Sequence, residues 1–274
     1  MNNTKCAVVF TDKRSPEYYF YHHWTYKLKK YFPNFEFTYF ALSTINSAIE
    51  MDKFTVWFKT DQKTLSYGVT KFCEPDILIV IGNDYPFEVL FGRAKKKVLI
   101  KTGDKHSEKY SNSFDLVITQ SKEQEKHYKK AITQLVVDTD YYKDFGYRKM
   151  FRDFFPQSEI SRLTSHFASE FSFNVNLNMP INLTSEMKRF FFNVSSMTTL
   201  LEKTDIIDLS LSSMSCNTPV ATPHADTTPI DYLMEFEGLV EYPFIVPESV
   251  NLREEYILPN FKISNMVKCL KQVL

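Results

Sequence analysis

Polar and charged residues follow several short apolar runs in the first half of the sequence, each at the point where a run ends. The three segments richest in such residues are Thr11–Arg14, Gly82–Asp84 and Lys101–Asp104. Their aspartates are carboxylates of the kind that accept a proton in general base catalysis, and their basic side chains attract anions. Gly82 and Gly103 would let the backbone approach a ligand. The pattern predicts a polar ligand site, with ordinary polar loops as the alternative.

A second group of polar residues lies in the second half, in two short segments. Ser195, Ser196, Thr198 and Thr199 are expected in a turn that follows a strand and precedes a helix. Hydroxyl groups and backbone amides at a helix N-terminus bind phosphate oxygens, although a plain capping turn has the same composition. His224, Asp226, Thr227 and Thr228 follow the next expected strand. An imidazole there can donate a hydrogen bond to a leaving phosphate or to the sugar.

The elements that must position these residues alternate between strands and helices. Apolar runs such as Asp76–Ile81 are hydrophobic on both faces, as in the middle of a parallel sheet covered by helices. Ligands of such sheets bind outside the carboxyl ends of the strands. The expected strands of the first half are Cys6–Phe10, Phe35–Phe40, Asp76–Ile81, Val98–Ile100, Leu116–Thr119 and Gln134–Val137, and the expected helices are Pro16–Tyr31, Asp61–Cys73, Pro86–Lys95 and Lys122–Lys130.

The second half predicts a second α/β unit, joined to the first by a Phe-rich helix. Asn217 is expected to end the helix before it in a left-handed conformation. The expected helices are Arg148–Phe171, Asp205–Cys216 and Phe261–Val273, and the expected strands are Phe173–Met179, Arg189–Val194, Thr218–Thr222 and a last region over Gly238–Val240 and Pro243–Val246.

Composition narrows the classes of protein further. The 274 residues carry no net charge, but the chain up to Phe145 has a net charge of +4 and the remainder −4. This shift predicts a domain boundary there, giving domains 1–145 and 146–274. With 6 glycines and neither GxGxxG nor GxxxxGK[ST], a glycine loop around phosphates is excluded. The 4 cysteines form no CxxC pair, which favours a reducing compartment and argues against a zinc ribbon.

No apolar run approaches the length needed to cross a bilayer, which is about 20 residues. The polar N-terminus does not resemble a signal peptide. We therefore expect a cytoplasmic protein. No convincing DxD pair follows a strand, because Asp138–Asp140 lies in the expected interdomain turn, so no metal ion is implied.

Several segments, in order along the chain, resemble the GT-B glycosyltransferases that use nucleotide sugars. Ser113–Ser121 is similar to that family's "aDlvitvS", and Val136–Tyr142 is similar to its "gVDtdrF". In the second half, Leu211–Thr222 (LSSMSCNTPVAT) looks like "lEAMAcGtPVva", and Thr228–Leu233 looks like "g.peiv". The resemblance implies two Rossmann-like domains that face each other across a cleft, with transfer of a sugar from a UDP- or GDP-sugar donor and no further cofactor.

The resemblance also implies roles for individual residues. The C-terminal domain would bind the donor, through Glu202 on the sugar or ribose hydroxyls and through Ser195, Ser196, Thr198, Thr199, Ser212, His224, Asp226, Thr227 and Thr228. The N-terminal domain would bind the acceptor and supply the general base of an inverting reaction. Asp104 is the first choice as base, ahead of Asp12 and Asp84. Lys13, Arg14, Asp84, Lys101 and Gly103 would then face the acceptor or the diphosphate.

Three departures from the family pattern keep other functions open. Ser212 and Thr204 stand where the family has its two glutamates, and no basic "GR…KG" run is present. These losses point to a divergent branch, such as a viral one, or to a protein that keeps the fold as a binding or structural module. A nucleotide-sugar epimerase is a third, weaker hypothesis. The acceptor stays open among glycans, lipids, proteins and a modified DNA base, the last suggested by the basic first domain.

Overall fold

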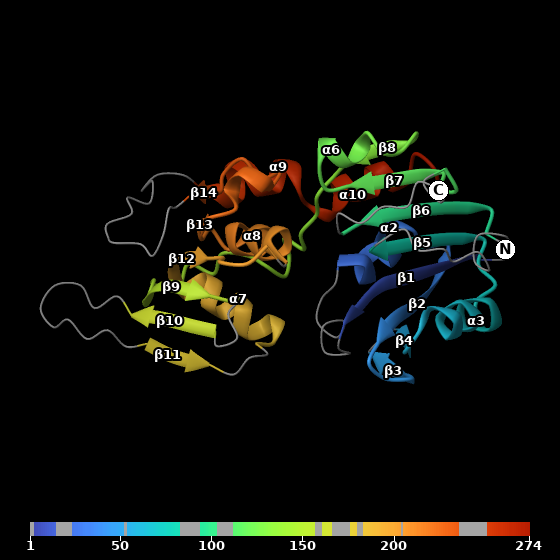
Figure 1. Cartoon of the computed structure of the whole chain (residues 1–274), viewed down its shortest axis with the longest axis horizontal. Coiled ribbons are helices and arrows are strands. Elements are labelled where there is room, and N and C mark those ends of the chain that lie inside the picture. Colours follow the sequence, from blue (N-terminus) through green and yellow to red (C-terminus); the bar gives the residue numbers. More distant parts are fainter. Residues whose placement is uncertain are drawn as a thin grey trace, which may run out of the picture. The chain divides into compact units, whose positions relative to one another are not determined.

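The computed structural model is a mixed α/β fold, which confirms the predicted fold class at that level. It describes residues 3–14, 24–51, 54–82, 94–102, 112–156, 161–165, 176–179, 183–203, 205–235 and 251–274. The chain folds into two compact units (Figure 1). Unit 1 comprises Met1–Leu135 and Ser264–Leu274, and unit 2 comprises Val136–Ile263, so the division falls before the expected boundary at 145/146 and the C-terminal helix belongs to the first unit.

Unit 1 is built on an eight-stranded sheet in the order β3-β4-β2-β1-β5-β6-β7-β8. All neighbouring strands are parallel except the β3–β4 pair. From β4 to β7 this is the 3-2-1-4-5-6 order of doubly wound sheets, and β8 extends it by one strand. The strands are β1 Thr4–Arg14, β2 Phe35–Ser43, β3 Ser47–Met51, β4 Phe54–Lys59, β5 Ile77–Gly82, β6 Lys96–Lys101, β7 Leu116–Thr119 and β8 Ala131–Thr133.

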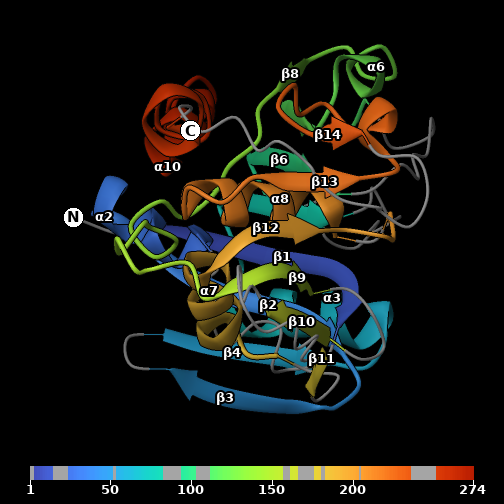
Figure 2. The same cartoon turned by 90° about the vertical axis from the view of Figure 1, so that its left-hand side faces the viewer.

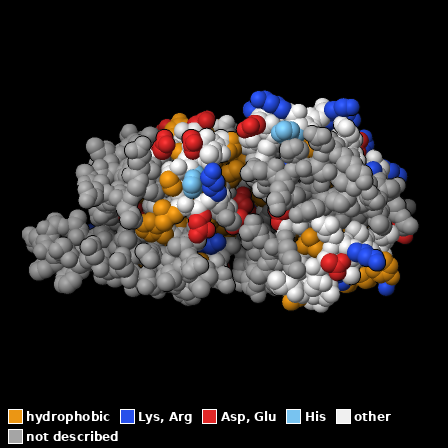
Figure 3. Space-filling model, in the orientation of Figure 1, with side chains coloured by type: hydrophobic (Ala, Val, Ile, Leu, Met, Phe, Trp, Pro, Cys, Tyr) orange, Lys and Arg blue, Asp and Glu red, His pale blue; other side chains and the backbone are white. Residues whose placement is uncertain are grey.

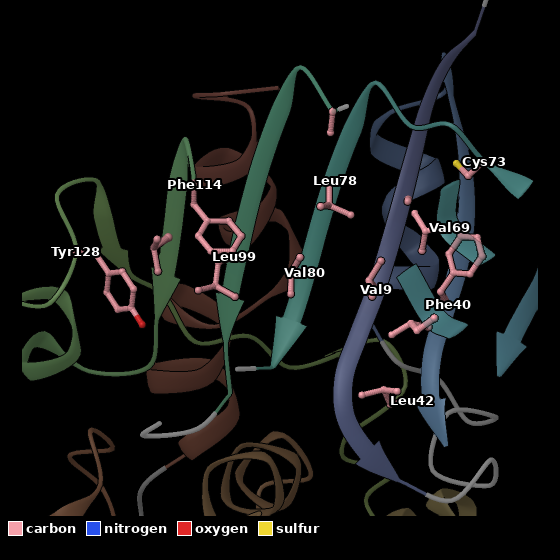
Figure 4. Packing of buried hydrophobic residues seen from close by; sticks show 14 residues of the cluster. Val9, Phe40, Leu42, Val69, Cys73, Leu78, Val80, Leu99, Phe114 and Tyr128 are labelled. Carbon is pink, nitrogen blue, oxygen red and sulfur yellow. The ribbon is translucent and has the colours of Figure 1, made fainter. Parts of the chain in front are cut away.

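Helices cover the sheet of unit 1, and its central strands are buried on both faces. Ala7, Val8 and Val9 of β1 are each completely buried, as the two-sided apolar pattern predicts. Residues of α3 pack against one face, where Val69 lies near Phe40 and Leu99 and Phe114 continue the same layer (Figure 4). The helices are η1 Trp24–Lys27, α2 Leu28–Tyr31, α3 Gln62–Phe72, α6 Lys122–Glu125 and α10 Ile263–Leu270, the last of which straddles the division between the units by one residue.

Unit 2 contains a six-stranded sheet in the order β11-β10-β9-β12-β13-β14. The β9, β12, β13 and β14 strands are parallel, and β10 and β11 continue the sheet in antiparallel fashion. Its strands are β9 Phe151–Phe155, β10 Ser161–Ser165, β11 Asn176–Met179, β12 Ser195–Thr199, β13 Val220–Thr222 and β14 Met234–Glu235. Its helices are α7 Ser185–Val194, α8 Ile206–Ser215, the short η2 Ala225–Thr227, the π-helical η3 Arg253–Ile257 and α9 Leu258–Asn260.

Four expectations about individual elements were wrong. The predicted helix Arg148–Phe171 contains the strands β9 and β10 instead, and the predicted strand Arg189–Val194 is the second half of α7. The last strand of unit 1 is Ala131–Thr133 rather than Gln134–Val137, of which only Val137 forms a bridge, to Lys262. The predicted helix Lys122–Lys130 ends at Glu125.

A hairpin of β3 and β4 was not predicted at all, and the two strands lie side by side along one edge of the unit 1 sheet (Figure 2). Most of the expected helix Pro86–Lys95 and the region Gly238–Val246 lie outside the described residues. In the part of the chain that the structure covers, no helix is long and apolar enough to cross a membrane.

The segment that begins unit 2 is fixed to α8 by one arginine. The Arg253 guanidinium donates to the carbonyl oxygens of Thr139 (2.9 Å), Tyr142 (2.9 Å) and Ser215 (2.8 Å), and also to the Ser215 hydroxyl. Ser215 is the last residue of α8, so the positive charge also lies at the negative end of the helix dipole. Arg253 therefore supplies hydrogen bonds to carbonyl oxygens of the 139–142 turn and of the end of α8, and the Tyr142 carbonyl accepts from the Ser215 hydroxyl as well.

We expect Arg253→Ala to lower the free energy of unfolding by about 1.5–3 kcal/mol, because it removes hydrogen bonds from a charged donor to partly buried acceptors. Denaturant unfolding monitored by circular dichroism measures the change. Arg148→Ala serves as the control, because Arg148 is exposed. A surface substitution of this kind should change stability by less than about 0.5 kcal/mol. Equal losses for the two variants would contradict the structural role of Arg253.

All four cysteines are free thiols and buried. Burial raises the pKa of Cys216 to about 12 and that of Cys6 well above its usual value, so neither forms a reactive thiolate near neutral pH. We expect the native protein to react slowly with a thiol reagent at pH 8 and all four groups to react rapidly after unfolding in guanidinium chloride. Rapid labelling of one equivalent in the native protein would show that a cysteine is accessible.

Candidate functional site

The carboxyl ends of the central strands of unit 1 meet at the topological switch point between β1 and β5. The chain leaves β1 toward β2 on one side and later returns to place β5 on the other, so the loops after these two strands diverge. Ligands of doubly wound sheets bind at this point. Five residues lie together at these strand ends. Thr11 and Asp12 follow the part of β1 that pairs with β5, Gly82 ends β5, Lys101 ends β6, and Thr102 comes directly after β6.

Short hydrogen bonds tie these strand ends to one another. The Thr102 hydroxyl donates to Asp12 Oδ2 at 2.6 Å, and the Thr102 amide donates to the Gly82 carbonyl at 3.3 Å. The Thr11 hydroxyl donates to the Ile81 carbonyl at 3.3 Å, across the β1–β5 pair. A carboxylate is thereby held at the switch point in one orientation, which is the arrangement that a base or a hydroxyl-binding group requires.

Lys101 is buried, with 2% of its surface exposed. Lysine is almost never buried to this extent unless its charge is paired, and Lys101 does have interaction partners. From its place in the sequence, Lys101 is expected near the acceptor or an anionic ligand. Its position at the end of β6 agrees with the expected strand end, but its ammonium group lies inside the unit rather than on the surface.

The structure tests the remaining unit 1 residues only in part. Asp84, Gly103 and Asp104 lie outside the described residues. Lys13 and Arg14 belong to β1, which runs through Arg14, and their side chains are also outside the described part. Sequence reasoning did not single out Thr102 within the KTGD segment, and its hydrogen bond to Asp12 adds it to the candidate site. The signal in the sequence was its place directly after a strand.

In unit 2, the carboxyl ends of β12 and β13 gather a second polar cluster. His224 Nε2 lies 3.2 Å from the Leu201 carbonyl, which links the turn after β13 to the loop after β12. Because a carbonyl oxygen only accepts, Nε2 carries the hydrogen, and Nδ1 is the ring nitrogen that accepts when His224 is neutral. Glu202 follows Leu201 and is exposed, as are Asp226 and Thr227.

The turn after β13 is held by its own hydrogen bonds. The Thr227 hydroxyl and amide both donate to the His224 carbonyl, at 2.9 and 3.1 Å, and the His224 amide donates to the Thr222 hydroxyl at 3.2 Å. Glu202, His224, Asp226, Thr227 and Thr228 thus follow strand ends at one edge of the sheet. Two carboxylates, an imidazole and two hydroxyls there can hydrogen-bond a polyhydroxylated or phosphorylated ligand.

The prediction of a turn at Ser195–Thr199 was wrong, because these residues form β12. Ser195 and Thr198 are completely buried, and the Ser213 hydroxyl of α8 donates to Thr198 Oγ1 at 2.8 Å. Thr199 is buried at the carboxyl end of the strand, and Ser196 is half-buried. The backbone amides of a paired strand form hydrogen bonds with the neighbouring strands. This segment therefore does not offer the predicted phosphate-binding amides.

Ser212 also lies in the interior, on α8. Its side chain hydrogen-bonds with the phenol of Tyr142, whose pKa is raised chiefly by burial. Ser212 therefore packs α8 against the 139–142 turn. That turn is shaped by Asp138, whose Oδ1 accepts the amides of Asp140 and Tyr141 at 3.1 Å each.

The turn between α8 and β13 is held in place by its backbone conformation and by a buried threonine. Asn217 has a φ of 58°, the left-handed conformation that was expected of it. The next residue, Thr218, is buried, and its hydroxyl accepts from Lys149 Nζ at 2.7 Å and donates to the Phe192 carbonyl. Although Lys149 as a whole residue is exposed, desolvation of its ammonium group lowers its pKa. The turn is thus hydrogen-bonded both to the segment that precedes β9 and to α7.

Among the described residues, no group of three or more His, Cys, Asp or Glu side chains is arranged to hold a metal ion. No family model matches the sequence, and a search of curated proteins finds no match. A search of solved structures finds similar chains, among them an alpha-glucosyltransferase in complex with UDP and a 13-mer DNA containing a HMU base. This likeness covers 80% of each chain at 12% identity, with a TM-score of 0.41. So distant a likeness leaves any assignment to rest on the residues of the chain itself.

Gly82 gives a direct test of the switch-point geometry. Its φ is 124°, and a Cβ there would lie 2.3 Å from Thr11 Oγ1 and 3.0 Å from Asp12 Oδ1. We expect Gly82→Ala to cost at least about 1–3 kcal/mol in unfolding free energy, from backbone strain together with displacement of Thr11 and Asp12. Denaturant unfolding measures the loss.

Gly146→Ala is the matched control, because Gly146 also has a positive φ of 65° but open space around its missing Cβ. It should cost only the conformational penalty of about 1–2 kcal/mol. If Gly82→Ala were no more destabilising than Gly146→Ala, the close packing of Gly82 against Thr11 and Asp12 would be wrong.

Proposed function

We propose that the protein transfers a sugar from a nucleotide-sugar donor to an acceptor, with the donor bound at the carboxyl edge of the unit 2 sheet. The observation that carries the proposal is the α8–turn–β13 segment. Asn217 adopts a left-handed conformation where the glycosyltransferase motif has glycine, and β13 leads directly into the cluster of His224, Asp226 and Thr227. Asparagine and glycine share this conformational tolerance, so the motif and the local backbone agree.

The donor would be held without a metal ion or a glycine loop. Glu202 is the proposed partner of the sugar or ribose hydroxyls, since a carboxylate accepts two hydroxyl hydrogen bonds. When its ring carries both protons, His224 can donate from Nδ1 to the leaving phosphate while Nε2 donates to the Leu201 carbonyl. Asp226, Thr227 and Thr228 complete the proposed donor set. Both a UDP-sugar and a GDP-sugar fit this description.

The acceptor would be activated by unit 1. We propose Asp104 as the general base; it follows Thr102 by two residues, and the Thr102 hydroxyl already holds Asp12 at the switch point. Asp12 is the second candidate for the base. The acceptor belongs to the hydroxyl-bearing classes named above. A modified DNA base is one of them, and the distant structural neighbour was solved with DNA containing a HMU base.

A panel of nucleotides and nucleotide sugars tests donor binding by thermal unfolding. A ligand present at ~100 times its dissociation constant stabilises the folded state by ~2.7 kcal/mol, which raises the melting temperature by several degrees. We expect a rise with one nucleotide family only. Glu202→Gln and His224→Ala should weaken that rise, whereas Glu255→Gln, an exposed carboxylate on η3, should leave it unchanged.

Turnover assays then separate the alternatives. Release of nucleoside diphosphate that depends on an added acceptor supports a transferase, and conversion of the donor alone would support an epimerase. Ligand binding without any turnover would favour the binding module, a hypothesis that the burial of Ser212 against Tyr142 supports. No stabilisation by any member of the panel at millimolar concentration would overturn the proposed donor site.

A further inference from the structure

One surface of unit 1, away from the strand ends described above, combines exposed aromatic rings with lysines. It is formed by the end of β4 and the outer side of α3, and hydrophobic and basic side chains gather over α3 (Figure 3). We call it the α3 face. Its members are Trp57, Lys59, Lys63, Tyr67, Lys71 and Phe72.

The aromatic rings of the α3 face are open to solvent to an unusual extent. Tyr67 is 64% exposed and Phe72 is 46% exposed. The Phe72 ring stacks on Trp57 with centroids 4.4 Å apart and an interplanar angle of 10°, so the two rings form one parallel platform. Because Trp57 packs against the buried core of the sheet, the platform is anchored at its inner end. Rigid, exposed rings of this kind can stack on a further planar group.

Lysines surround these rings. Lys71 Nζ lies 5.6 Å from the Tyr67 ring centroid and 5.5 Å from that of Phe72, and Lys59 Nζ lies 5.9 Å from the Trp57 ring. Lys63 precedes Tyr67 by one helical turn, so Lys63, Tyr67 and Lys71 line one side of α3. The Lys71 ammonium lies over the faces of the two rings, so a stacked base would take its place there, and the flexible lysine stem lets the ammonium turn to a phosphate of the same strand.

The carboxylates near the α3 face do not cancel this charge. Asp61 is the only acidic residue between Lys59 and Phe72, and it caps α3 by accepting the Thr64 amide at 2.9 Å and the Thr64 hydroxyl at 2.8 Å. Those hydrogen bonds lower the pKa of Asp61, so it stays ionised but faces the helix amides. Glu74 follows the helix and has partners of its own. Lys59, Lys63 and Lys71 thus outnumber Asp61 and Glu74 by three charges to two along residues 59–74.

From these observations we infer that the α3 face binds single-stranded nucleic acid, with bases stacked on Tyr67 and Phe72 and phosphates next to Lys63 and Lys71. Proteins that bind single strands without sequence preference combine aromatic stacking platforms with basic side chains in this way. A protein partner is a poorer match, because lysine is depleted from protein–protein interfaces. The inference does not depend on glycosyl transfer, since it concerns residues outside both strand-end clusters.

Fluorescence anisotropy of the full chain tests the inference with a labelled 12-nucleotide oligothymidylate and an abasic 12-mer of the same charge, each titrated at low salt. Stacking predicts that the thymidylate binds more tightly than the abasic strand. Tyr67→Ala should weaken thymidylate binding by about fivefold or more. Lys71→Gln should reduce the slope of log K against log salt by about 0.7, the contribution of one phosphate contact to a single strand.

The matched controls are Tyr232→Ala, which removes a ring that is 45% exposed in unit 2, and Lys268→Gln, an exposed lysine on α10. Neither should change thymidylate affinity. Equal binding of the two strands to the unmodified protein would overturn the inference without any variant. So would full affinity of Tyr67→Ala, or sedimentation showing that this face joins two copies of the chain and binds no oligonucleotide.

Discussion

The β1 strand hydrogen-bonds to β2 along one side and to β5 along the other, and its apolar side chains are buried on both faces of the sheet. This double pairing fixes where the chain reverses its direction of travel across the sheet. The polar ends of β1, β5 and β6 can meet only because their registers place Phe10 opposite Ile81, and Gly82 opposite Lys101. A shift by one residue would turn Asp12 away from Thr102 and bury the wrong side chains. The geometry of the switch point therefore follows from ordinary strand pairing.

Strands with apolar residues on both faces were predictable, because a run as short and as rich in β-branched residues as Ile77–Ile81 favours a buried strand over a helix. Other elements were missed for identifiable reasons. The run RFFFNV resembles a buried strand, yet the Thr184 hydroxyl accepts the Met187 amide at 3.2 Å and Glu186 lies in the first turn. These two features favour the start of a helix, and the segment forms α7 instead of a strand. The sequence between β3 and β4 has neither glycine nor proline, so the residues that usually indicate a hairpin turn were absent.

The candidate site was predictable where it depends on strand ends and unpredictable where it depends on the length of a helix. His224, Asp226 and Thr227 follow a short strand that the motif located correctly. The serines and threonines at 195–199 were assigned to a turn because the preceding helix was interpreted as a strand, whereas the helix and the strand that follow were placed correctly. The Asp12–Thr102 hydrogen bond joins residues ninety positions apart. No local pattern encodes such a pairing, since it arises from the order of strands in the sheet.

The last helix of the chain belongs to the first unit. The α10 helix buries Met266, Val267 and Leu270, and Lys271 lies over the Phe32 ring of unit 1. The segment Val136–Ile263 is thus inserted between two parts of unit 1. During synthesis on the ribosome, unit 2 emerges whole before the helix that unit 1 still lacks. The apolar surface that α10 will cover therefore stays open while the whole inserted segment is translated. Vectorial folding would complete the inserted unit first, although it starts later in the chain.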